Sequence, residues 1–167
     1  PERLRSLIGE AHKRDIKVIL YLNLIPEETK TVWHQNNDAG RWRTEHPFSQ
    51  DMVGKVSRRR DLMDLNSPFY EHRLRDLDYI FDEIGADGVF IDWFTPFGCS
   101  REHDFNQGIP TNNINRLIDL ITYIKGKGKS VFIHSSEETR IPFLEDLADG
   151  FATGERGGTG LLPSPLP

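Results

Sequence analysis

The apolar positions along the chain follow two kinds of pattern in turn. From Pro1 to Arg14 they recur at the three-and-four spacing that places side chains on one face of a helix. From Ile16 to Leu24 they run with little alternation, which is typical of a parallel strand covered on both faces by helices. The first predicted unit is therefore a helix followed by a buried strand.

The order of helix and then strand recurs three times. Ser67-Pro68 is a favourable helix start, with Ser67 as N-cap, and the apolar face that follows runs up to Gly85. The segment GADGVFIDWF then predicts a short strand that ends at Asp92. Two more units are expected, a helix over 114–124 with a strand over 130–134, and a helix over 140–148 with a strand over 149–153.

Alternating helices and buried strands select a parallel sheet with right-handed crossovers, either an open sheet or a closed barrel. The 167 residues favour the open sheet, because a whole (β/α)8 barrel needs about 250 residues. Polar residues directly after the apolar runs favour the barrel, since such positions ring one mouth of it; they are Asn23, Asp92, His134 and Glu155. We predict part of a (β/α)8 barrel over residues 1–156 and a Gly/Pro-rich irregular end over 157–167.

The segment from Ile25 to Arg60 lacks a strong period and is too long for a plain connection. Long ordered loops of barrels are commonly lids or walls of a binding site. The aromatic and histidine residues of this segment are therefore candidates for substrate binding, and we expect them to fold over the same end of the sheet as Asp92. They are Trp33, His34, Trp42, His46 and Phe48. The alternative is that the two tryptophans fill a small satellite core.

Composition excludes several classes of partner. The net charge of −5 argues against nucleic acid or an anionic membrane, and no apolar run approaches the length of a membrane span. A soluble protein, cytoplasmic or secreted, is expected. The single cysteine permits no internal disulfide. The histidines and acids show no close metal-ligand spacing, and no glycine-rich loop follows a strand in the GxGxxG or GxxxxGK spacing, so neither a metal nor another cofactor is predicted.

Asp92 is the residue most suited to carry chemistry. It follows the apolar run without a turn residue between, so a rigid strand would hold its carboxylate. Trp93 and Phe94 adjoin it, and aromatic surface beside a carboxylate suits the binding of a sugar ring. The alternative is that Asp92 caps the next loop or pairs with an arginine.

A second carboxylate is needed for retaining glycoside cleavage, about 5–5.5 Å from the first. Glu137 and Glu138 follow the next strand, and Glu155 ends the one after it. The alternative for Glu137 and Glu138 is a helix cap or a solvated loop, and the alternative for Glu155 is an ion pair with Arg156.

Asn23 and His134 are candidates for binding substrate hydroxyls. The alternative is that they satisfy structural hydrogen bonds.

Three segments together resemble the central strands of (β/α)8 glycoside hydrolases of the broad alpha-amylase and alpha-galactosidase superfamily. These are LRSLIGEAHKRDIKVILYLNL, DLMDLNSPFYEHRLRDLDYIFDEIGADGVFIDWF and KSVFIHSSEE, within Leu4 to Glu155. The resemblance implies that the strands are the third to sixth of the barrel and that Asp92 is the nucleophile. Amylase-like enzymes carry the acid/base after the fifth strand, which would be Glu137 or Glu138. Clan D alpha-galactosidases carry it after the sixth, which would be Asp149 or Glu155.

The sequence departs from both groups, since Phe90 stands two residues before Asp92 where they have Arg or Lys. The expected function is a retaining glycoside hydrolase with a carbohydrate substrate. The alternatives are a carbohydrate-binding barrel without activity and an inactive truncated fragment.

Overall fold

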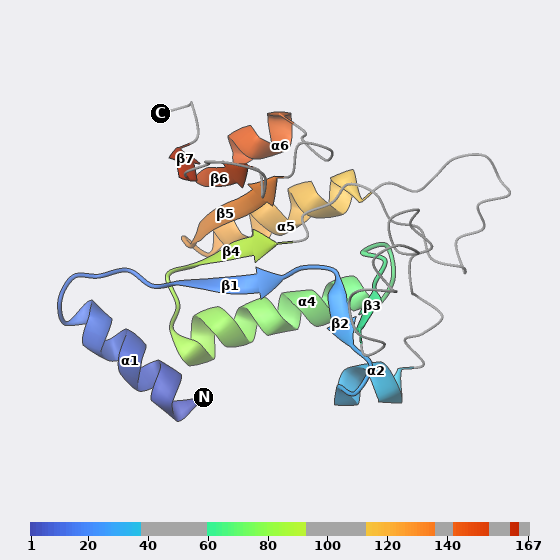
Figure 1. Cartoon of the computed structure of the whole chain (residues 1–167), viewed down its shortest axis with the longest axis horizontal. Helices are drawn as coiled ribbons and strands as arrows, with labels where there is room; N and C mark the ends of the chain where they lie inside the picture. The colour runs from blue at the N-terminus through green and yellow to red at the C-terminus, as the bar shows by residue number, and fades with distance from the viewer. Residues whose placement is uncertain (38–59, 93–112, 136–141, 154–160, 164–167) are drawn as a thin grey trace, which may run out of the picture.

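The computed structural model describes residues 1–37, 60–92, 113–135, 142–153 and 161–163 (Figure 1). Their elements, in chain order, are α1 (Glu2–His12), β1 (Ile19–Asn23), β2 (Pro26–Glu28), α2 (Val32–Asn36), β3 (Arg60–Leu62), α4 (Phe69–Asp78), the π-helical turn η2 (Tyr79–Ile84), β4 (Gly88–Asp92), α5 (Ile114–Gly126), β5 (Ser130–Ser135), α6 (Pro142–Leu147), β6 (Gly150–Thr153) and β7 (Leu161–Pro163). All four predicted units of helix and strand are present.

The main sheet has the strand order β1-β4-β5-β6-β7. The pairs β1·β4, β4·β5 and β5·β6 are parallel, and only β7 runs antiparallel to its neighbour. Sequential parallel strands joined by helices are the arrangement of a (β/α) barrel segment. The predicted fold class is confirmed.

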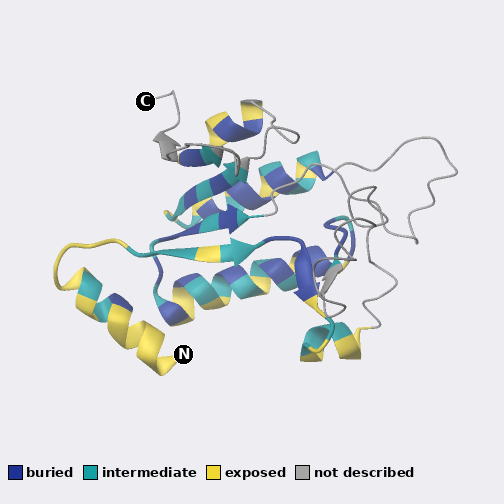
Figure 2. Cartoon of the chain, viewed as in Figure 1, coloured by how far each residue is buried: buried dark blue, intermediate teal, exposed yellow. Residues whose placement is uncertain are grey.

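The two faces of the sheet differ. Val89 and Ile91 of β4 are buried and belong to one cluster with Leu117 and Ile121 of α5. The alternate residue, Phe90, is only partly buried. In Figure 2 the strands accordingly mix buried and partly exposed positions, whereas α1 is largely exposed. Among the described residues β1 is not covered on both faces, since Tyr21 in the middle of the strand is exposed, so the expected helical cover on both faces of the first strand is wrong.

The residues around α4 explain where that helix begins and where η2 ends. The Ser67 hydroxyl accepts a hydrogen bond from the Phe69 N–H at 3.2 Å and donates to the Asp64 carbonyl at 2.6 Å. The predicted bond from Ser67 to a backbone N–H of the first turn is found, but the helix begins at Phe69 and its N-cap residue is Pro68, one residue later than predicted. Gly85 follows η2 with a φ of 86°, in the left-handed region that glycine adopts without strain.

The repeated Asp-Gly pair has a structural role at the amino-terminal edge of the sheet. Asp87 Oδ2 accepts from the Val18 N–H at 2.7 Å, and Asp149 Oδ2 accepts from the Val131 N–H at 2.8 Å. Gly88 cannot carry a side chain, because a Cβ there would lie 2.3 Å from the Ser130 carbonyl oxygen. Asp149 precedes β6, at the opposite end of the sheet from Asp92, so naming it as a possible acid/base was wrong.

Short elements lie in two stretches where the sequence pattern predicts none. The segment from Ile25 to Arg60 contributes α2 and β2, and β3 begins at its last residue and pairs antiparallel with β2. The second is β7, Leu161–Pro163, within the stretch predicted to be irregular. This strand pairs antiparallel with β6. Strands of three residues are too short to show a period in the sequence.

Candidate active site

The carboxyl ends of the parallel strands lie at one edge of the sheet. Asn23 at the end of β1 pairs in register with Asp92 at the end of β4, and Ser135 pairs with Thr153. This confirms the predicted placement of Asn23, Asp92 and Thr153 at one end of adjacent strands. Glu137, the fourth residue of that prediction, lies outside the described residues.

Both carboxylate oxygens of Asp92 have hydrogen-bond partners. His134 Nδ1, on β5, lies 2.9 Å from Asp92 Oδ1. The Tyr21 hydroxyl, on β1, donates to Asp92 Oδ2. The side chains of His134 and Asp92 keep 20% and 22% of their surface exposed. The Asp92 carboxylate is therefore held in a fixed orientation from both neighbouring strands, and it stays partly open to solvent instead of being enclosed in a core.

Tyr21 is a further residue of this site that the sequence does not single out by itself, although its place in the strand is a signal for it. Residues two apart in a strand point to the same face, so Tyr21 shares the face of Asn23. Its ring stacks on Phe90 with the centroids 6.0 Å apart and an angle of 24° between the planes. Its hydroxyl also lies 3.1 Å from Asn23 Oδ1. Because a hydroxyl has one proton, the bond to Asp92 leaves Asn23 as a neighbour rather than a second acceptor.

Trp33 lies in a different environment from Asp92. Its ring is parallel to that of His72, with centroids 4.5 Å apart and planes 3° apart. It also packs on Phe69 at 5.4 Å. Both partners belong to α4, so the structure supports the alternative in which this tryptophan packs α2 against the core.

Other sequence candidates lie outside the described residues: Trp42, His46, Trp93, Glu137, Glu138 and Glu155. Their roles remain predictions. In the part of the chain that the structure describes, no three His, Cys, Asp or Glu residues are grouped as a metal site would require. No helix in the same part has the length and apolar character of a membrane span.

No family model matches the sequence, and no curated protein matches it. Solved structures do share its fold. The maltogenic alpha-amylase AmyB from Thermotoga neapolitana is 13% identical with a TM-score of 0.61, and the match covers 90% of this chain and 31% of AmyB. The glycoside hydrolase domain of PelA from Pseudomonas aeruginosa is 13% identical with a TM-score of 0.54 over 95% of this chain and 62% of that domain.

A third similar structure is Ega3 from Aspergillus fumigatus in complex with galactosamine. It is 12% identical with a TM-score of 0.52, over 78% of this chain and 48% of Ega3. The chain therefore spans from about a third to under two thirds of the length of these three proteins. At such identities the likeness establishes the fold alone, which is that of part of a (β/α)8 barrel.

Proposed function

We propose that this chain is the part of a glycoside hydrolase barrel that contains the nucleophile, and that the nucleophile is Asp92. The observation that carries the proposal is the position of Asp92 at the carboxyl end of a parallel barrel strand, with both oxygens held by Tyr21 and His134. In barrel enzymes the residues at this end of the strands carry the chemistry. The glycoside hydrolases of similar fold support the choice of reaction.

The proposed reaction retains the configuration of the sugar and has two steps. Asp92 attacks the anomeric carbon and forms a glycosyl ester while a glutamic acid gives its proton to the departing oxygen. The same glutamate then takes a proton from water, which attacks the anomeric carbon and releases Asp92. Glu137 and Glu138 are proposed for this acid/base role because they follow β5, the strand beside β4, and Glu155 is the rival after β6.

Neighbouring side chains would assist each step. Tyr21 and His134 hold the two carboxylate oxygens, so the attack needs little reorientation of Asp92. Asn23, beside Asp92 in the sheet, is proposed to bind a sugar hydroxyl. Trp42, His46 and Trp93 are proposed to contact the sugar, since aromatic rings cover its apolar faces.

Binding of carbohydrate without catalysis is the second candidate. Phe90 favours it, because this apolar residue occupies the position two before Asp92 where related enzymes have a cation. Phe90 instead packs between Tyr21 and His134, with centroids 6.0 and 6.4 Å away. In this case saccharides would bind but no substrate would turn over.

The test uses the protein expressed from its full coding sequence, with activated aryl α-glucosides and aryl galactosaminides as substrates. Asp92→Asn should remove turnover of every substrate, because an amide cannot form the ester. Replacing the true acid/base by Gln should spare the first step, since a good leaving group needs no proton. Added azide should then restore turnover in only one of three variants, Glu137→Gln, Glu138→Gln or Glu155→Gln, and give a glycosyl azide. Normal turnover by Asp92→Asn would refute the proposal.

A further inference from the structure

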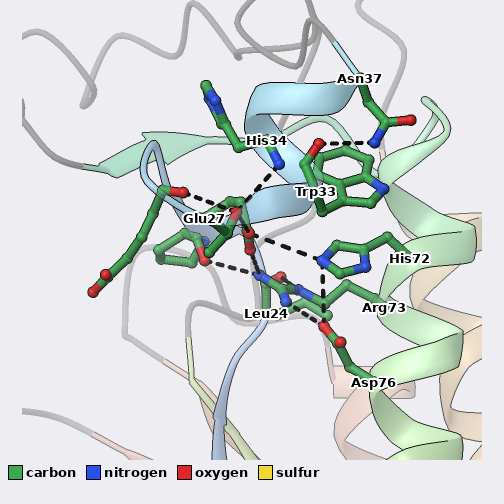
Figure 3. A network of polar contacts seen from close by, with 11 residues as sticks. Leu24, Glu27, Trp33, His34, Asn37, His72, Arg73 and Asp76 are labelled. Carbon is green, nitrogen blue, oxygen red and sulfur yellow. Dashed lines mark hydrogen bonds and ion pairs between the residues drawn. The ribbon is translucent and has the colours of Figure 1, made fainter.

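A buried ionic group lies where the chain leaves β1. Arg73 of α4 and Glu27 of β2 are 6% and 5% exposed. Arg73 Nη2 donates to Glu27 Oε2 at 2.8 Å, and Nη1 donates to Asp76 Oδ2 at 2.6 Å. Figure 3 shows these side chains converging between α4 and the start of α2. Charges this deep are retained only where they are paired and hydrogen-bonded.

Arg73 also holds the backbone that follows β1. Its Nε donates to the Leu24 carbonyl at 2.8 Å, and its Nη2 donates to the Pro26 carbonyl at 2.9 Å. The guanidinium lies over the Phe69 ring, 4.4 Å from its centroid. Because the planar guanidinium of Arg73 donates to four acceptors and packs on an aromatic ring, its orientation is fixed.

Leu24 connects this group to the candidate active site. Its N–H donates to the Asp92 carbonyl at 2.9 Å, so the chain stays bonded to the end of β4 one residue beyond the end of β1. Leu24 is fully buried, and its carbonyl accepts a hydrogen bond from Arg73 while its N–H donates one to the Asp92 carbonyl. The residue before it is Asn23, and Tyr21 lies two further back on the same strand.

We propose that Arg73 is a positioning residue for the Asp92 site, acting through Leu24 and held in place by Glu27. By fixing the end of β1, Arg73 fixes where Tyr21 and Asn23 meet Asp92. A shift of about 1 Å at a reacting group is enough to slow a reaction on the order of a hundredfold. The consequence for turnover rests on the proposed glycosidase function, whereas the consequence for the Asp92–His134 contact does not.

Arg73→Lys is the informative variant, because it keeps the charge beside Glu27 but lacks the fork that reaches four acceptors. The first readout is the ring ¹⁵N shift of His134, assigned by its loss in His134→Gln, which reports the contact with Asp92 without any substrate. We expect it to move in Arg73→Lys. We expect kcat to fall about ten- to a hundredfold while KM changes by less than about threefold, as for an interaction needed only in the transition state.

The matched control is Ile124→Ala in the buried face of α5, which lowers stability through a cavity away from the group. It should leave the His134 shift and kcat unchanged well below its melting temperature. If Arg73→Lys does not fold, Glu27→Gln replaces it and should move the same shift in the same direction, though less. An unmoved His134 shift in the folded variant, or an equal movement in the control, overturns the positioning role. A moved shift in a protein that turns over no substrate supports the positioning role and counts against the glycosidase.

Discussion

His134 Nδ1 lies 2.9 Å from Asp92 Oδ1, across the neighbouring parallel strands β5 and β4. A second His–Asp contact of the same kind, His12 Nε2 to Asp87 Oδ2 at 2.8 Å, lies at the opposite edge of the sheet. The two contacts have the same chemistry but different positions. They therefore provide a matched pair of substitutions.

His134→Phe should lower kcat/KM on the order of ten- to a hundredfold, because it removes the group that holds Asp92 Oδ1 from β5. His12→Phe should leave kcat/KM unchanged and lower only stability. Steady-state kinetics of both variants, with melting temperatures, makes the comparison. Equal losses of activity in the two variants would show that His134 acts through stability alone.

Tyr21→Phe should lower kcat about tenfold or more while the fold is kept, since the donation to Asp92 is lost but the ring can still stack on Phe90. Tyr21 is 59% exposed, so little packing depends on it. Tyr79→Phe, at another exposed tyrosine on η2, is the control. Unchanged kcat in Tyr21→Phe would exclude a role for the hydroxyl.

The stability of the fold should depend on Glu27 in acid. Burial alone would raise the pKa of Glu27, but the contacts with His72 and Thr31 and the charge of Arg73 outweigh burial and lower this pKa from 4.5 to about 2. A pKa lowered by folding stabilises the folded state above the ordinary value, and this contribution is lost as the pH falls from 4.5 toward 2. It is on the order of 3 kcal/mol at neutral pH.

Urea unfolding of the wild type and Glu27→Gln at pH 7, 4.5 and 3 measures this contribution. The difference in free energy of unfolding should be largest at pH 7 and should shrink at each lower pH. Glu83→Gln, at an exposed glutamate bonded to Arg5, should show a small difference throughout. If the difference in free energy of unfolding between the wild type and Glu27→Gln does not change with pH, the lowered pKa of Glu27 in the folded state is wrong.

Asp87→Ala and Asp149→Ala should each cost about 1–2 kcal/mol, because each removes the acceptor of a backbone N–H at the amino-terminal edge of the sheet. Asp82→Ala loses only an exposed pair with Lys127 and should cost under about 0.5 kcal/mol. Denaturant midpoints measure all three. A cost for Asp82→Ala as large as the other two would mean that general charge, not the backbone bond, sets the effect.

The sequence predicted Asp92 and its strand because local features agreed. A capped helix ends at Gly85, an apolar run follows, and the acid stands directly after it. The partner Tyr21 could not be predicted in the same way, since its contact with Asp92 depends on the register of strands 71 residues apart. The sequence indicates only that Tyr21 and Asn23, two residues apart in β1, point to the same face of the sheet.

The sequence gives a clearer signal for Arg73, since its position in the predicted helix is on the buried face. It lies four residues after Phe69 and four before Leu77, on the buried face of α4. A charged residue on such a face requires a buried partner, but nothing local indicates that the partner is Glu27, 46 residues away. Long-range pairings of this kind become visible only once the fold is known.

The central claim is that Asp92 forms a bond to the sugar. It is tested most directly by incubating the protein with a glycosyl fluoride that carries a second fluorine on its ring, which slows both steps while fluoride still departs. Peptide mass spectrometry should then find one added glycosyl group on Asp92, and none in Asp92→Asn. A label on Glu137, Glu138 or any other carboxylate of the wild type would contradict the assignment of Asp92 as the nucleophile.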